Sequence, residues 1–246
     1  MEHSIQTMEL PNLPVKARAV LTEVVTGLHE KLGNNLYSCI LYGSAVRGSF
    51  NARSSDINVL IILNESTPDA HRDISRILKT KFRIEPFVIS RIGMERSFEA
   101  FAIKFCSIQR HYRVLFGEDP LRDLEIDERI LHFLTEQSLR NLRLRVVRAY
   151  IHLGGERKRY LDYIVRIIPQ VFTDIGTAFR VRGFQVEEGF AERIPLLREQ
   201  LGDAANVLDD LLAIKGRKIV LSDSDIFRLH EKLFTLLDSA VTWISK

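Results

Sequence analysis

The chain is poor in the features that mark secreted, membrane-embedded and zinc-stabilised proteins. Only two cysteines, Cys39 and Cys106, occur in 246 residues, too few for a disulfide framework, so a reducing compartment is expected. The seven histidines form no metal-spaced cluster, which argues against a zinc site. No apolar run reaches the roughly eighteen residues of a membrane span, and residues 1–14 lack the apolar core of a signal peptide. We therefore expect a cytoplasmic protein without a membrane partner.

The chain also has little excess of one charge over the other. The formal net charge is +3, too small to argue for nucleic-acid binding. Basic residues do gather between residues 137 and 183, but aromatic side chains do not alternate with them, as binding of single strands would require. Hydrophobic content of 46% and charged content of 27% are ordinary for a globular protein of one or two domains. No nucleic-acid partner is expected.

In the first 121 residues the spacing of apolar residues alternates between patterns typical of helices and patterns typical of strands. Apolar positions at helical spacing predict helices at residues 14–32, 68–81 and 94–109. Continuous or alternating apolar runs predict strands at residues 36–42, 57–63 and 81–90. Cys39 falls inside the first strand, where it is expected to be a small core residue.

After Pro120 the strand pattern stops. Amphipathic stripes predict helices at residues 127–153, 157–182 and 223–245, and a shorter pair of helices over residues 190–214 that is broken at Gly202. Ser222 and Asp225 are placed to cap the last helix. Short connections between such helices favour an antiparallel bundle. The sequence thus predicts an α+β protein with a mixed sheet and helices at residues 1–121, followed by an all-helical bundle domain at residues 122–246.

A glycine and a serine end the first strand. Gly43 would let backbone N–H groups approach a phosphate closely, and Ser44 would add a hydroxyl donor at the start of a short helix. After a polar spacer, Asp56 and Asn58 open the second strand. Alternation along a strand places these two side chains on one face while Ile57 points into the core. Two oxygen-bearing side chains beside a phosphate cradle suit a Mg²⁺ ion that carries a nucleoside triphosphate.

This arrangement of Gly43-Ser44, a spacer and Ser55-Asp56-Ile57-Asn58 resembles the signature of the polymerase-β-type nucleotidyltransferase superfamily. The segments LYGSAVRG and SDI are similar to the corresponding segments of small bacterial two-domain members such as the antibiotic nucleotidyltransferases. The segment VLFGEDPL at residues 114–121 is similar to the end of their catalytic domain. The resemblance covers roughly residues 15–121 and implies a nucleotidyltransferase domain at residues 1–121.

One position departs from the pattern. The family carries a second aspartate where this chain has Asn58, and an amide is a neutral and weaker ligand for a hard cation. The missing carboxylate should weaken the metal that activates the attacking hydroxyl more than the metal that escorts the triphosphate. Weak activity, activity with one metal and loss of activity all remain open.

The family places a further acid on the neighbouring strand, and Glu85 is the only acid inside the predicted third strand. It would complete the metal ligands Asp56 and Asn58 or, together with Asp56, serve catalysis as general base on the acceptor hydroxyl. The competing interpretation is an exposed residue on an edge strand, which the following Pro86 also favours.

Several polar residues are candidates for nucleotide binding. Arg47 lies one turn beyond Ser44 and could clamp a phosphate, as could Arg53 in the spacer, although solvated basic side chains are an equal or better interpretation. Ser55 would organise the turn before the second strand. In two-domain relatives the helical domain closes over the nucleotide. We therefore expect Lys158 and Arg159 to contact the triphosphate from that domain. The alternative is that both belong to a solvated helix face.

The resemblance implies Mg²⁺-dependent transfer of a nucleoside monophosphate from an NTP to a hydroxyl of a small molecule or a protein. The alternative is a catalytically degenerate nucleotidyltransferase fold that acts as a nucleotide-binding or antitoxin-like interaction module. The sequence leaves open the acceptor, the base of the NTP and the oligomeric state, including a homodimer.

Overall fold

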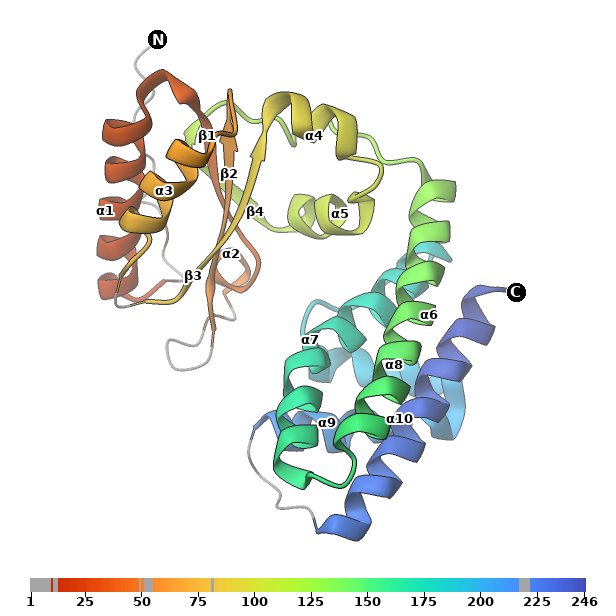
Figure 1. The fold of residues 1–246 in the computed structure, drawn as a ribbon. Helices are drawn as coiled ribbons and strands as arrows, with labels where there is room; N and C mark the ends of the chain where they lie inside the picture. Colours follow the sequence, from red (N-terminus) through yellow and green to blue (C-terminus); the bar gives the residue numbers. More distant parts are fainter. Residues whose placement is uncertain (1–9, 11–12, 49, 51–54, 81, 217–221) are drawn as a thin grey trace. The chain divides into compact units, whose positions relative to one another are not determined.

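The computed structural model describes residues 10, 13–48, 50, 55–80, 82–216 and 222–246 (Figure 1). The chain divides into two compact units, Met1–Ile126 and Asp127–Lys246. The first contains a four-stranded sheet with helices on both faces, and the elements described in the second are helices. The α+β class predicted from the sequence is confirmed.

The sheet of the first unit is mixed. Its strands are β1 (Leu36–Tyr42), β2 (Ile57–Leu63), β3 (Ile84–Ser90) and β4 (Tyr112–Gly117). They lie in the order β3-β2-β1-β4, with β1 antiparallel to both β2 and β4, and β2 parallel to β3. Strand β3 is therefore an edge strand, where a proline such as Pro86 is tolerated because one side of the strand needs no backbone donors.

Two pairs of helices sandwich the sheet. The helices of this unit are α1 (Val15–Leu32), α2 (Ser44–Arg47), α3 (Pro68–Ile77), α4 (Arg91–Ser97) and α5 (Ala102–Arg110). Figure 1 shows α1 and α3 on one face and α4 and α5 on the other. The prediction of one helix at 94–109 was wrong, because the chain turns at residues 98–101. Two short helices bring Met94 and Phe105 into the same apolar cluster over the sheet.

Alternation along the strands separates the two cores. Leu41 and Val59 join the cluster beneath α1 and α3, whereas Leu60 and Ile62 join the cluster beneath α4 and α5. Asn58 is in phase with Leu60 and thus belongs to the face covered by α4 and α5. Cys39 is fully buried, and burial raises the pKa of its thiol to about 12, so this thiol stays protonated as an inert core group.

The second unit is built from helices around one apolar core. Its elements are α6 (Glu128–Leu153), α7 (Arg157–Val181), α8 (Phe190–Leu201), the 3₁₀ helix η2 (Gly202–Asn206), α9 (Val207–Lys215) and α10 (Asp223–Ile244). The predicted cap of α10 is confirmed, since the Ser222 backbone N–H donates to the Asp225 carboxylate at 2.8 Å. None of the helices described is both long and apolar enough to cross a lipid bilayer.

Candidate active site

A glycine turn links β1 to the single-turn helix α2. Gly43 has φ +80° and ψ −141°, a conformation open to glycine at little cost and strained for other residues. Its N–H donates to the His111 carbonyl at 3.0 Å, and its carbonyl accepts from the N–H groups of Val46 and Arg47 at 3.1 and 3.0 Å. A Cβ at this position would lie 3.3 Å from the side-chain nitrogen of Asn58. The turn and the start of β2 are therefore in close contact.

The start of β2 is also aligned with β3. Asn58 is the register partner of Tyr42 on β1 and of Glu85 on β3. In-register side chains on adjacent strands project to the same face, so Asn58 and Glu85 lie side by side on the face of the sheet where α4 and α5 pack. Asn58 is half-buried and Glu85 is exposed. Glu85 is thus an exposed residue on an edge strand and, at the same time, a neighbour of the predicted metal strand.

Asp56 has a cationic partner that the sequence analysis missed. The Arg83 Nε lies 3.0 Å from the Asp56 Oδ1, and the Arg83 carbonyl accepts from the Ile57 N–H at 2.9 Å. The side chains of Arg83 and Asp56 are 75% and 31% exposed, so the pair is accessible to solvent and exchangeable. The sequence did contain a signal for this partner: Arg83 precedes Glu85 by two residues, and side chains two residues apart on a strand point to the same face.

Oxygen donors suited to a hard cation thus lie near the beginning of β2 and β3, on one face of the sheet. They are the carboxylates of Asp56 and Glu85 and the amide oxygen of Asn58. In the part of the chain that the structure describes, no group of three or more His, Cys, Asp or Glu side chains is arranged to hold a metal. Two carboxylates with one amide fit a single Mg²⁺ that completes its shell with phosphate oxygens and water better than they fit two ions.

The other predicted residues of this unit surround the turn. Ser44 begins α2 directly after Gly43, and Arg47 ends it; both are half-buried. Ser55, also half-buried, precedes Asp56. Arg53 lies outside the described residues. The structure therefore brings Gly43 next to Asn58, with Ser44, Arg47 and Ser55 close to them along the chain.

Lys158 and Arg159 belong to the second unit. Both are exposed at the start of α7, and the Arg159 guanidinium donates to the Glu156 carboxylate at 2.6 Å. This pair, one helical turn apart, raises the pKa of Arg159 through the hydrogen bond and the charge of Glu156. Their part in nucleotide binding stays a prediction.

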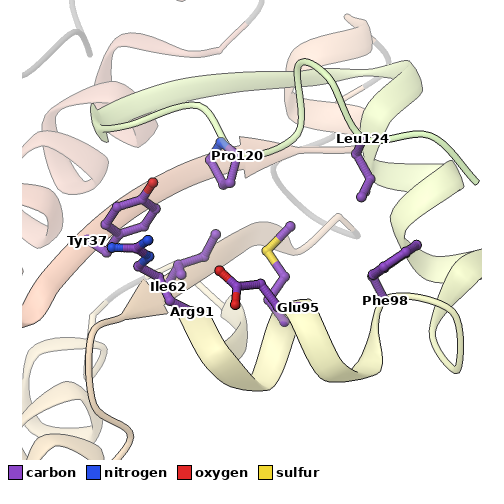
Figure 2. A pocket seen from close by; sticks show the side chains of 8 residues that line it. Tyr37, Ile62, Arg91, Glu95, Phe98, Pro120 and Leu124 are labelled. Carbon is purple, nitrogen blue, oxygen red and sulfur yellow. The ribbon is translucent and has the colours of Figure 1, made fainter.

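A separate cavity of about 290 Å³ lies on the same face of the sheet (Figure 2). It lies toward the far end of β2, since Ile62 in its wall is four residues beyond Asn58. Its walls are largely apolar, and the Arg91 guanidinium lies 4.6 Å from the Tyr37 ring centroid at its rim. This cavity is not part of the cluster at Gly43, Asn58 and Glu85.

No protein-family model and no curated protein sequence matches the chain. Among solved structures, the chain is similar to the crystal structure of spectinomycin adenyltransferase AAD(9) from Enterococcus faecialis with ATP and spectinomycin. The TM-score is 0.58, and the match covers 93% of this chain and 99% of that chain. This protein has a nucleotidyltransferase fold. Because the two sequences are only 14% identical, the likeness establishes the fold and leaves the substrate to chemical argument.

The nucleotidyltransferase fold agrees with the resemblance inferred from Gly43-Ser44 and from Ser55-Asp56-Ile57-Asn58. The match includes most of both units, since it covers 93% of the chain. The predicted combination of a mixed sheet with helices and a following helical region is therefore confirmed as a whole.

Proposed function

We propose that the protein transfers a nucleoside monophosphate from an NTP to a hydroxyl of a small-molecule acceptor, with Mg²⁺ as cofactor. The observation that carries this proposal is the alignment of Asn58 with Glu85 across β2 and β3, directly against the Gly43 turn. The fold adds support, because a protein of similar fold is known with ATP and spectinomycin, a nucleotide and a small-molecule acceptor.

Each residue has a role that its chemistry allows. Gly43 and Ser44 hold the triphosphate, Gly43 because it has no side chain to block the phosphates and Ser44 through its hydroxyl. Asp56 and Asn58 would hold a Mg²⁺ ion that neutralises charge on the triphosphate, with Glu85 as either a third ligand or the general base. To bind the metal, Asp56 would give up its solvent-accessible ion pair with Arg83.

In the role of general base, Glu85 takes up the proton of the acceptor hydroxyl. The acceptor hydroxyl oxygen attacks the α-phosphorus and forms the new P–O bond while its proton passes to the Glu85 carboxylate. The bond between the α-phosphorus and the bridging oxygen breaks, and pyrophosphate leaves with that electron pair. Glu85 is exposed and can therefore meet an acceptor that enters from solvent.

A second function is a nucleotide-binding module without turnover. Two observations favour it: Asn58 is neutral where an acid would draw in a second metal, and the Asp56 carboxylate is engaged by Arg83. Such a module would bind Mg²⁺-NTP through the same residues and release no pyrophosphate.

Calorimetry with ATP, GTP, CTP and UTP, with and without Mg²⁺, tests the proposal on wild type, Asp56→Ala and Asn58→Asp. Spectinomycin serves as the first acceptor probe in an assay of pyrophosphate release. The control is Asp69→Ala, which removes an exposed acid from α3 on the opposite face of the sheet.

Enzymatic function requires Mg²⁺-linked binding of at least one NTP and acceptor-dependent pyrophosphate release. Asp56→Ala should weaken Mg²⁺-linked binding by about tenfold or more, since a charge-assisted contact is lost, whereas Asp69→Ala should not. Binding without release by wild type, together with release by Asn58→Asp, would support the module instead. No NTP binding by any variant would refute both functions and leave an interaction protein.

A further inference from the structure

A lysine that the sequence analysis did not single out reaches the same face of the sheet. Lys104 lies in α5, one of the two helices on the face of the sheet to which Asn58 and Glu85 belong. Its Nζ is 4.9 Å from the centroid of the Tyr42 ring and 5.7 Å from that of the Phe87 ring. Among the described residues Lys104 contacts these two rings and forms no ion pair. The side chain is exposed, so its ammonium is available to a ligand.

The two rings locate the ammonium over β2. Tyr42 on β1 is the register partner of Asn58, and Phe87 on β3 is the register partner of Leu60. Neighbouring strands are about 4.8 Å apart and a two-residue step along a strand is about 6.7 Å. A cation close to rings on both β1 and β3 must therefore lie above the strand between them, over the Asn58–Leu60 stretch. Glu85 borders the same patch, because it precedes Phe87 by two residues on β3.

Two acids and two basic side chains named above border this patch. Asp56 and Glu85 contribute two negative charges, and Arg83 and Lys104 contribute two positive charges. An acid at position 58 would share this patch with the Lys104 ammonium, which would compete with a divalent cation for that carboxylate. With an amide at position 58, the lysine brings a fixed positive charge to a patch that lacks the second carboxylate. An ammonium is a point charge suited to phosphate oxygens.

We propose that Lys104 is a phosphate-binding residue of this site, and that its ammonium takes the place of a second divalent cation beside the triphosphate. The inference rests on the proposed function, because it names the charge that the same site offers to a nucleotide. It makes the site a one-metal site. The competing interpretation, a lysine stem that merely covers two aromatic rings, requires the methylene groups and not the charge.

Lys104→Met separates the two interpretations, because methionine keeps a long apolar side chain over the rings and removes the charge. Lys104→Arg keeps the charge. The control is Lys31→Met in α1, an exposed lysine on the helix that covers the other face of the sheet. Each variant is first compared with wild type by circular dichroism and thermal unfolding. Binding of ATP and of the other three NTPs is then measured by calorimetry over a series of Mg²⁺ concentrations.

Lys104→Met should weaken NTP binding by about tenfold both with and without Mg²⁺, because a charged phosphate contact is lost. Lys104→Arg should stay within about threefold of wild type, and Lys31→Met should be unchanged. Electron paramagnetic resonance with Mn²⁺ should count one ion per bound nucleotide in wild type and two in the double variant Asn58→Asp/Lys104→Met.

Two results would overturn the inference in different ways. If wild type binds Mg²⁺-NTP and Lys104→Met binds it equally well, the role of Lys104 is refuted while the proposed function stands. If wild type counts two Mn²⁺ ions per nucleotide, the one-metal site is refuted. If wild type binds no NTP at all, the proposed function and this inference fail together.

Discussion

Asn58 and Glu85 are register partners on the parallel strands β2 and β3. Asn58 also lies against the glycine turn, since a Cβ on Gly43 would be 3.3 Å from its side-chain nitrogen. One amide therefore joins the turn that we assign to the phosphates with the acid that we assign to the acceptor. A substitution at Gly43, Asn58 or Glu85 should therefore alter the placement of the other two residues.

Gly43→Ala should lower stability and nucleotide affinity together. A side chain at φ +80° costs about 1–3 kcal/mol of strain, and the new methyl group would press on Asn58. Gly33→Ala is a matched control, because Gly33 has φ 53° and ψ −129° with no atom within 4 Å of the added Cβ. Urea unfolding should show a loss in both variants, and calorimetry with Mg²⁺-NTP a loss in Gly43→Ala alone. Equal nucleotide affinity in the two variants would refute the assignment of the Gly43 turn to the nucleotide.

Arg83→Gln should strengthen divalent-metal binding. The Arg83 guanidinium lies 3.0 Å from the Asp56 carboxylate, so removing it frees a ligand from a competing cation. We expect Mn²⁺ affinity to rise about threefold to tenfold, and the free energy of unfolding to change by less than about 1 kcal/mol, because the pair is exposed. Arg72→Gln, which removes the partner of Asp69 at 2.8 Å on α3, should leave Mn²⁺ binding unchanged. A Mn²⁺ affinity that stays constant or falls in Arg83→Gln would show that Asp56 does not bind the metal.

His230 should make the helical unit sensitive to acid. Its ring stacks on Tyr150 with centroids 4.0 Å apart, and its Nδ1 lies 3.0 Å from the Tyr160 hydroxyl. Burial lowers the pKa of His230 below its ordinary value of 6.5. The folded protein thus takes up this proton less readily than the unfolded chain. This contribution to stability is intact above about pH 6.5 and is lost as the pH falls through the lower folded-state value.

The measurement is urea unfolding of wild type and His230→Phe from pH 7.5 to 5. The advantage of wild type over the variant should shrink as the pH falls, because phenylalanine has no proton to gain. His152→Gln, at an exposed position on α6, should keep the wild-type pH dependence. A difference between wild type and His230→Phe that is constant with pH would refute the prediction.

Arg193 should be the most sensitive charged residue of the helical unit to a conservative change. It is 3% exposed and donates to three backbone carbonyls, those of Phe172, Glu187 and Glu188, at 2.9, 2.6 and 2.9 Å. A lysine has one nitrogen and cannot reach three such acceptors, so Arg193→Lys should cost about 2–4 kcal/mol. Arg198→Lys, at an exposed pair with Asp209, should cost less than about 1 kcal/mol in the same urea experiment. Similar losses for the two variants would show that the three carbonyl contacts contribute little.

Local chemistry made part of the site readable from the sequence. The two-residue period of a strand places Asp56 and Asn58 in one phase, and Gly43 marks a turn that a residue with a Cβ would strain. Pro86 indicated an edge strand, and Ser222 with Asp225 indicated the start of the last helix. These are short-range rules that act within a few residues, so they need no knowledge of the rest of the fold.

The sequence by itself therefore determined which segments form helices or strands and where the sheet region gives way to helices. It also determined that Asp56 and Asn58 share one face of β2. Only the tertiary structure decided that Glu85 stands opposite Asn58, that Arg83 holds Asp56, and that Lys104 reaches over Tyr42 and Phe87. Strand order and register depend on how two faces of apolar side chains pack beneath α1, α3, α4 and α5. That packing is a property of residues far apart in the chain, and no local pattern encodes which of them meet.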